Sequence, residues 1–104
     1  MFIIGMLKEE LENSVRARDA FIRAMEKLPR GSLVRKVIGG HQYYYLAQRE
    51  GRKVRFNYVG KLNEPELKRY IDAKEYRVRY RRQISEIDKQ IKFINKVISG
   101  QKSA

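Results

Sequence analysis

The chain has 104 residues, enough for one domain with a modest core, so residues 1–104 are predicted to form a single domain. Lysine and arginine number 24 against 12 aspartates and glutamates, a formal net charge of +12. A net charge of roughly 2 to 8 is enough to keep a small domain soluble. The excess therefore predicts an acidic partner: nucleic acid, anionic lipid or an acidic protein surface. The chain has no cysteine, which excludes disulfides, thiolate zinc sites and cysteine nucleophiles and favours the cytoplasm.

A first helix is predicted over residues 6–28. Its apolar residues, among them Leu7, Leu11 and Val15, recur at three- and four-residue steps, as on one face of an amphipathic helix. Pro29 then ends the helix. The apolar stretch before it lacks a basic region and a cleavage site and is too short to span a bilayer. We expect it to begin a helix or a strand against the core, or to contact a second subunit.

Residues 32–60 change to short runs rich in valine, isoleucine, tyrosine and phenylalanine. The pairs Gly39-Gly40 and Glu50-Gly51 separate these runs and suit hairpin turns. The pattern predicts an antiparallel β-meander of three strands, at residues 33–38, 42–48 and 53–59.

A second, long helix is predicted over residues 63–98. Asn63 can cap its start, with Glu66 three residues later and Pro65 in the first turn, where a missing N–H does no harm. Ser99-Gly100 is predicted to end the helix, which leaves a disordered tail over residues 99–104.

The second half of this helix carries isoleucines at alternating steps of three and four residues, the spacing of a coiled-coil seam. They are Ile84, Ile87, Ile91, Ile94 and Ile98. The first helix can supply the partner, which predicts an α+β fold: a two-helix antiparallel coiled-coil hairpin with a three-stranded antiparallel β-meander inserted between the helices. The seam could also meet a second subunit and form a homodimer.

The positive charge is unevenly distributed along the chain. Residues 1–26 hold four basic and five acidic residues, a net of −1. Residues 27–61 hold nine basic residues against one acidic residue, and residues 68–82 hold seven against two. The excess therefore begins at the meander and continues into the first half of the long helix.

Both of these stretches interleave basic residues with aromatic ones, a combination that offers phosphate contacts and rings for stacking the bases of single-stranded nucleic acid. The alternative is that half of the strand tyrosines are core residues, since alternation buries every second side chain. Tyr44 and Leu46 would then share one face, and Tyr43, Tyr45 and Ala47 the other. The predicted nucleic-acid-binding residues are Arg35, Lys36, Tyr43, Tyr45, Arg52, Lys53, Arg55, Arg77, Arg79, Arg81 and Arg82.

For the arginine run at residues 76–82, the alternative is a solvated helix face whose arginine stems cover apolar neighbours. Acidic partners one turn away are scarce there, which favours an anion-binding role. His41, the only histidine, follows a glycine pair and is expected to be a turn residue. Neither paired carboxylates nor a phosphate-binding glycine loop nor a metal motif is found, so we expect no enzymatic activity, cofactor or metal.

Four segments together resemble a family of small uncharacterised proteins from archaea, bacteria and their mobile elements: residues 28–33, 40–46, 49–54 and 58–61. The hairpin of Tyr-Tyr-Tyr-Leu, a charged turn, Lys-Val and Tyr-x-Gly is also similar to a segment of some insertion-sequence transposases. The resemblance implies a meander feeding a basic helix in a mobile-element or viral setting. It supplies no catalytic residues, because the acidic triad of the transposases has no counterpart in this chain.

Two functions follow as hypotheses. The first is a cytoplasmic nucleic-acid-binding protein, for DNA or RNA, that uses the meander and the proximal half of the second helix. The second is a mobile-element or viral inhibitor or adaptor that binds a nucleic-acid-handling machine such as a CRISPR effector. A membrane-surface role is disfavoured, since no bulky apolar face stands opposite the basic residues.

Overall fold

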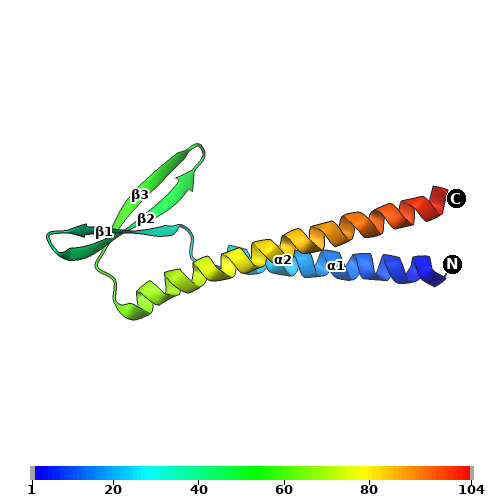
Figure 1. Cartoon of the computed structure of the whole chain (residues 1–104), viewed down its shortest axis with the longest axis horizontal. Helices are drawn as coiled ribbons and strands as arrows, with labels where there is room; N and C mark the ends of the chain where they lie inside the picture. The colour runs from blue at the N-terminus through cyan, green and yellow to red at the C-terminus, as the bar shows by residue number, and fades with distance from the viewer. Residues whose placement is uncertain (1, 104) are drawn as a thin grey trace. The chain divides into compact units, whose positions relative to one another are not determined.

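The computed structural model describes the backbone of residues 2–103 and the side chains of residues 2–100. Two helices flank a three-stranded sheet in the chain (Figure 1). The elements are α1 (Phe2–Glu26), β1 (Ser32–Ile38), β2 (His41–Glu50), β3 (Lys53–Gly60) and α2 (Glu64–Ser103). The predicted α+β class, with the meander between the two helices, is confirmed.

These elements form two compact units. The sheet unit is Leu28–Tyr76 and holds the three strands with the first turns of α2. The helical unit is formed by α1 and the part of α2 from Arg77 onward. Each unit is described by itself below, and the prediction that residues 1–104 form one domain stays a prediction.

In the helical unit, α1 and the distal part of α2 run side by side in opposite directions, with both chain ends at the same end of the hairpin (Figure 1). Ile94 is 5% exposed and Ile98 is also buried, while Ile84, Ile87 and Ile91 are partly buried. The isoleucine seam therefore packs within one chain. A homodimer through the exposed flank of this seam stays a prediction.

The facing stripe of α1 differs from its sequence prediction at one turn. Leu7 and Leu11 are partly buried as expected, but Val15 is exposed and Ser14 is only 5% exposed. The stripe keeps the alternating three- and four-residue spacing of a coiled coil, and this spacing after Leu11 selects residue 14. Spacing thus overrides side-chain polarity at this turn.

Polar contacts across the hairpin accompany this stripe. The Gln90 amide donates to Ser14 Oγ at 2.9 Å and to Glu10 Oε1 at 3.2 Å. Arg18 Nε donates to Asp88 Oδ1 at 2.5 Å. As residue numbers rise along α1, those of the partners fall along α2, as an antiparallel hairpin requires.

In the sheet unit, the strands follow one another in the order β1-β2-β3, each antiparallel to its neighbour. The predicted meander is therefore confirmed. Gly39 and Gly40 form its first turn with φ of 58° and 79°, the positive values that a tight two-residue hairpin requires. A bulge between Tyr44 and Tyr45 shifts the pairing of β2 with β3.

The observed ends of the two helices agree with the sequence prediction at some positions and differ at others. The Glu66 N–H donates to Asn63 Oδ1 at 2.9 Å, so the predicted cap of α2 is present. The apolar N-terminal stretch continues α1 back to Phe2.

The predicted end of α2 at Ser99-Gly100 is wrong, because the helix continues to Ser103. One glycine costs a helix only about 1 kcal/mol and leaves its hydrogen bonds intact. Of the predicted disordered tail, residue 104 lies outside the described residues.

Candidate nucleic-acid interface

The two sides of the sheet differ chemically, because successive side chains of a strand point to opposite sides. Tyr44 is 8% exposed and borders a cleft that Leu67 and Tyr70 of α2 also line. Tyr43 and Tyr45 lie on the other side, which we call the ring face. The tyrosine triplet therefore divides between core and surface, as the alternation predicted.

β3 supplies a third ring to this surface. Tyr58 is paired with Tyr45, and its ring centroid lies 5.3 Å from that of Tyr45 and 6.3 Å from that of Tyr43. The prediction of His41 as a turn residue is wrong, because His41 begins β2 and pairs with Ile38. Its ring continues the series, with its centroid 6.4 Å from that of Tyr43. We call the series His41, Tyr43, Tyr58 and Tyr45 the ring ladder.

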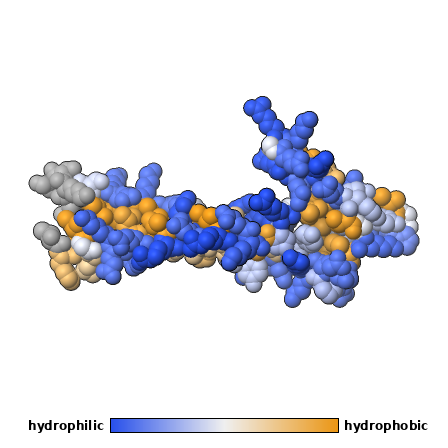
Figure 2. Space-filling model, turned by 180° about the vertical axis from the view of Figure 1, so that it is seen from behind, coloured by the Kyte–Doolittle hydropathy of each residue, from blue (hydrophilic) through white to orange (hydrophobic). Residues whose placement is uncertain are grey.

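Much of the ring face remains open to solvent. Tyr58 is 60% exposed and Phe56, which lies on the same side opposite Ala47, is 58% exposed. Hydrophobic residues reach the surface of both units among hydrophilic ones (Figure 2). Exposed apolar groups gathered on one surface are typical of interaction sites, whereas scattered ones are ordinary.

Basic side chains accompany the rings. Lys36 Nζ lies 4.9 Å from the centroid of the Tyr45 ring, a cation–π contact. Arg49 is exposed and lies on the same side of β2 as Tyr43 and Tyr45, because an even number of positions separates them. The one acidic residue of the sheet, Glu50, lies on the opposite side, where it pairs with Arg55 at 3.4 Å. The ring face is thus aromatic and positively charged.

The other basic residues predicted for the sheet do not join this surface. Arg35, Lys53 and Arg55 alternate onto the opposite side, and Arg52 lies in the turn between β2 and β3. Arg35 borders a cleft of about 290 Å³ between the sheet and α2. Of the sheet residues predicted to bind, the structure brings together Lys36, Tyr43 and Tyr45.

The arginine run belongs to the helical unit and is not uniform. Arg79, Arg81 and Arg82 are exposed. Arg77 is partly buried, since it falls on the inward stripe of α2 three residues before Tyr80. Three of the four predicted arginines are therefore exposed residues.

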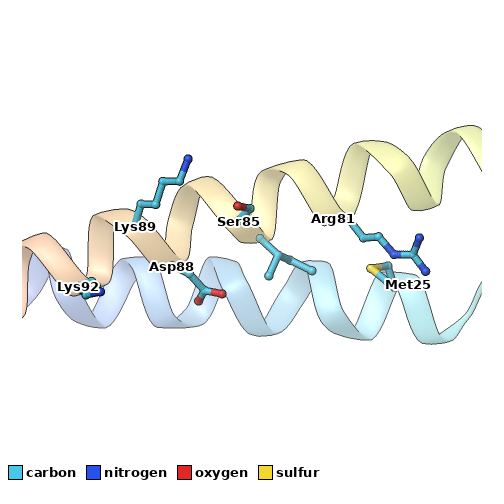
Figure 3. A pocket seen from close by; sticks show the side chains of 7 residues that line it. Met25, Arg81, Ser85, Asp88, Lys89 and Lys92 are labelled. Atoms are coloured by element: carbon cyan, nitrogen blue, oxygen red, sulfur yellow. The ribbon is translucent and has the colours of Figure 1, made fainter.

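Arg81 also borders a groove of about 430 Å³ on the helical unit (Figure 3). Its side chain points toward Met25 of α1, whereas Lys89 points away from α1. The groove is lined by Met25, Arg81, Ile84, Ser85, Asp88, Lys89 and Lys92.

The single carboxylate of this groove is already paired, since Asp88 bonds to Arg18. Lys89 lies 3.5 Å from Glu86, but both side chains are mostly exposed, so the pair holds the lysine only weakly. The groove therefore has an excess of positive charge suited to phosphate groups and presents no aromatic ring.

Sequence reasoning missed Phe56, Tyr58, Lys89 and Lys92 as site residues. The signal for Tyr58 was the strand register, because pairing through the Glu50-Gly51 turn brings it opposite Tyr45. The signal for the lysines was helical spacing, because Lys89 and Lys92 follow Arg81 and Ser85 on one side of α2.

Within residues 2–103, no group of three or more histidine, aspartate or glutamate residues is placed to hold a metal ion. No helix in this described part of the chain has an apolar stretch long enough to cross a membrane.

Residues 6–69, more than half of the chain, match the family described as "Domain of unknown function (DUF6788)". The matched stretch covers most of α1, the whole sheet and the first turns of α2, so it includes the complete ring ladder and ends before the arginine run. No curated protein and no solved structure matches the chain.

Proposed function

We propose that this chain, which belongs to the DUF6788 family, is a non-enzymatic nucleic-acid-binding protein. Its sheet unit contacts bases through the ring face, and its helical unit contacts phosphates through Arg79, Arg81 and Arg82. We place this activity in the cytoplasm, because the chain has no cysteine with which to form disulfides.

The ring ladder is the observation that carries the proposal. The ring centroid of Tyr58 lies 5.3 Å from that of Tyr45 and 6.3 Å from that of Tyr43. Lys36 lies beside these rings, and no acidic residue of the sheet lies on their face. Aromatic rings on a sheet surface stack nucleic-acid bases, and neighbouring cations neutralise the phosphates. The 60% exposure of Tyr58 leaves this ring surface available.

Fluorescence anisotropy with labelled single- and double-stranded DNA and RNA tests the proposal. If about six phosphates are neutralised, log affinity falls against log salt with a slope near −4 on single strands and −5 on duplex DNA. A titration across about 50 to 300 mM salt measures that slope. The proposal fails if none of the four probes binds at the lowest salt.

That negative result would favour the second hypothesis, a mobile-element or viral inhibitor or adaptor that binds a nucleic-acid-handling machine. The observation on its side is a set of apolar side chains exposed on the helical unit, since such groups suit protein contacts. They are Phe2, Ile3, Met6 and Phe93. Capture of one purified effector complex that survives nuclease treatment and moderate salt would support it.

A further inference from the structure

We infer that the ring ladder selects a single-stranded segment and takes one unpaired base on each of Tyr43, Tyr58 and Tyr45. This inference rests on the proposed function and narrows it from nucleic acid in general to unpaired strands, whether DNA or RNA. It also assigns a base-binding role to Tyr58.

The spacing of the rings is the first argument. Bases of one strand in a duplex are stacked about 3.4 Å apart. Neighbouring tyrosine ring centroids of the ladder are 5.3 and 6.3 Å apart, and the Tyr45 and Tyr58 rings are inclined by 58° to each other. Bases that lie on these rings must therefore be separated and tilted relative to one another. A paired, continuously stacked strand cannot adopt that arrangement.

The position of the rings is the second argument. They belong to β2 and β3 and lie on an open sheet surface, where side chains stand roughly perpendicular to the sheet. In a duplex, the flat faces of the bases are covered by their neighbours and only the base edges are open in the grooves. Rings on a sheet surface can reach base faces only when the strand is unpaired and its bases are splayed out.

Lys36 supplies the third argument. Its ammonium lies 4.9 Å from the centroid of Tyr45, where it covers part of the ring. Such a contact at an exposed site contributes about 0.5 to 1 kcal/mol, less than the roughly 1 to 3 kcal/mol of a stacked base. A base can therefore displace the ammonium, which then remains within reach of the adjoining phosphate.

The alternative is that the rings only stabilise the sheet, since aromatic cross-strand pairs contribute about 0.2 to 1 kcal/mol each. The Tyr45 and Tyr58 pair certainly makes that contact. However, Tyr58 remains 60% exposed after pairing, so most of its surface contributes nothing to the packing of the sheet. A binding experiment on probes that differ only in their bases separates the two roles.

The experiment compares three labelled probes of about ten nucleotides at one salt concentration, close to the site size of a small single-strand-binding module. They are an intact single strand, the same strand with abasic sugars at its central positions, and the duplex. The abasic strand keeps every phosphate and lacks the bases that would stack. We expect the intact strand to bind at least about 10-fold more tightly than either of the others.

Substitutions then assign this preference to the ladder. We expect Tyr58→Leu to weaken binding of the intact strand about 10-fold and to leave binding of the abasic strand within about 2-fold. Tyr58→Phe keeps the ring and should restore the preference. Phe93→Leu is the matched control, because it removes a ring that is 67% exposed on the helical unit.

Each outcome has a separate meaning. Abasic or duplex probes that bind as tightly as the intact strand, with Tyr58→Leu equal to wild type, would overturn the inference and leave the proposed function standing. Failure of all three probes to bind at low salt would instead overturn the proposed function. Intact RNA and DNA strands tested in parallel show which of the two the surface prefers.

Discussion

The sheet unit and the helical unit carry the same net charge and differ in where their rings lie. Leu28–Tyr76 holds eleven basic against five acidic residues and the rest of the chain holds thirteen against seven, a net of +6 in each. In the helical unit, the rings of Phe21 and Tyr80 pack against each other, with their centroids 5.7 Å apart. In the sheet unit, Tyr58 extends a row of rings along an open surface. Phe2 and Phe93 of the helical unit are exposed as well. Neither charge nor exposure of single rings therefore distinguishes the units, whereas the row of neighbouring rings on the sheet does.

This difference separates two kinds of recognition. Phosphates are contacted by charge without regard to sequence, whereas stacking requires the bases themselves. We expect substitutions of rings to change the dependence on bases, and substitutions of basic residues to change the dependence on salt.

The largest effect is expected from removing the rings of the sheet unit. The triple variant Tyr43→Leu, Tyr45→Leu and Tyr58→Leu loses three stacking contacts of at least about 1 kcal/mol each, so its affinity for single strands should fall at least about 100-fold. The salt slope measured by anisotropy should not change. A slope that flattens with the affinity would show that these rings act through the neighbouring cations.

Ile94 in the helical unit should show the next largest effect, on stability. Ile94→Ala removes a side chain that is 5% exposed and should lower the free energy of unfolding by about 2 to 4 kcal/mol. Tyr58→Leu should lower it by less than about 1 kcal/mol, because that ring is mostly exposed. Urea denaturation followed by circular dichroism measures both. Equal losses would mean that Tyr58 is a core residue of the sheet.

The arginines of the helical unit should affect salt dependence. Arg79→Ala, Arg81→Ala and Arg82→Ala together should weaken binding on the order of 10-fold for all sequences alike and flatten the single-strand salt slope by about 2. Anisotropy across salt concentrations measures the slope.

The matched control removes the same charge from α1 through Lys8→Ala, Arg16→Ala and Arg23→Ala, where acidic neighbours are common. An equal effect in this control would mean that net charge, rather than the arginine run, controls binding.

The smallest effect is expected at the groove of Figure 3. Lys89→Gln with Lys92→Gln removes two of its three cations, and should weaken binding a few-fold and flatten the slope by about 1. The comparison of intact and abasic strands should be unchanged, because the groove has no ring. A change in that comparison would contradict the separation of base and phosphate contacts between the units.

Much of the fold could be predicted because its signals are local. The isoleucine spacing, the Asn63 cap and the Gly39-Gly40 turn each depend on a few neighbouring residues. Ser14 shows the limit, because its burial depends on coiled-coil spacing and on Gln90, which lies 76 residues away.

The candidate site could be predicted only in part. Alternation divided the strand tyrosines into two groups. It did not decide that Tyr44 would be the buried one, on the side of the cleft with α2, and that Tyr43 would lie partly buried on the ring face. The register of β3, counted from the Glu50-Gly51 turn, placed Tyr58 opposite Tyr45, whereas the bulge that begins beyond this pair has no strong signature in the sequence. Arg35 and Lys36 show the same limit, since adjacent cations lie on opposite sides of one sheet.

The buried Ser14 has a consequence for the alignment of the helices. An apolar stripe alone permits slippage by whole heptads, because leucine and isoleucine pack in either alignment. A slip would separate the Ser14 hydroxyl from the Gln90 amide, and an unpaired buried hydroxyl costs about 1 to 3 kcal/mol. It would also separate Arg18 from Asp88. The hairpin thus gives up some hydrophobic contact at its middle and gains a single alignment. That alignment fixes where the cations of α2 from Arg77 onward lie along α1.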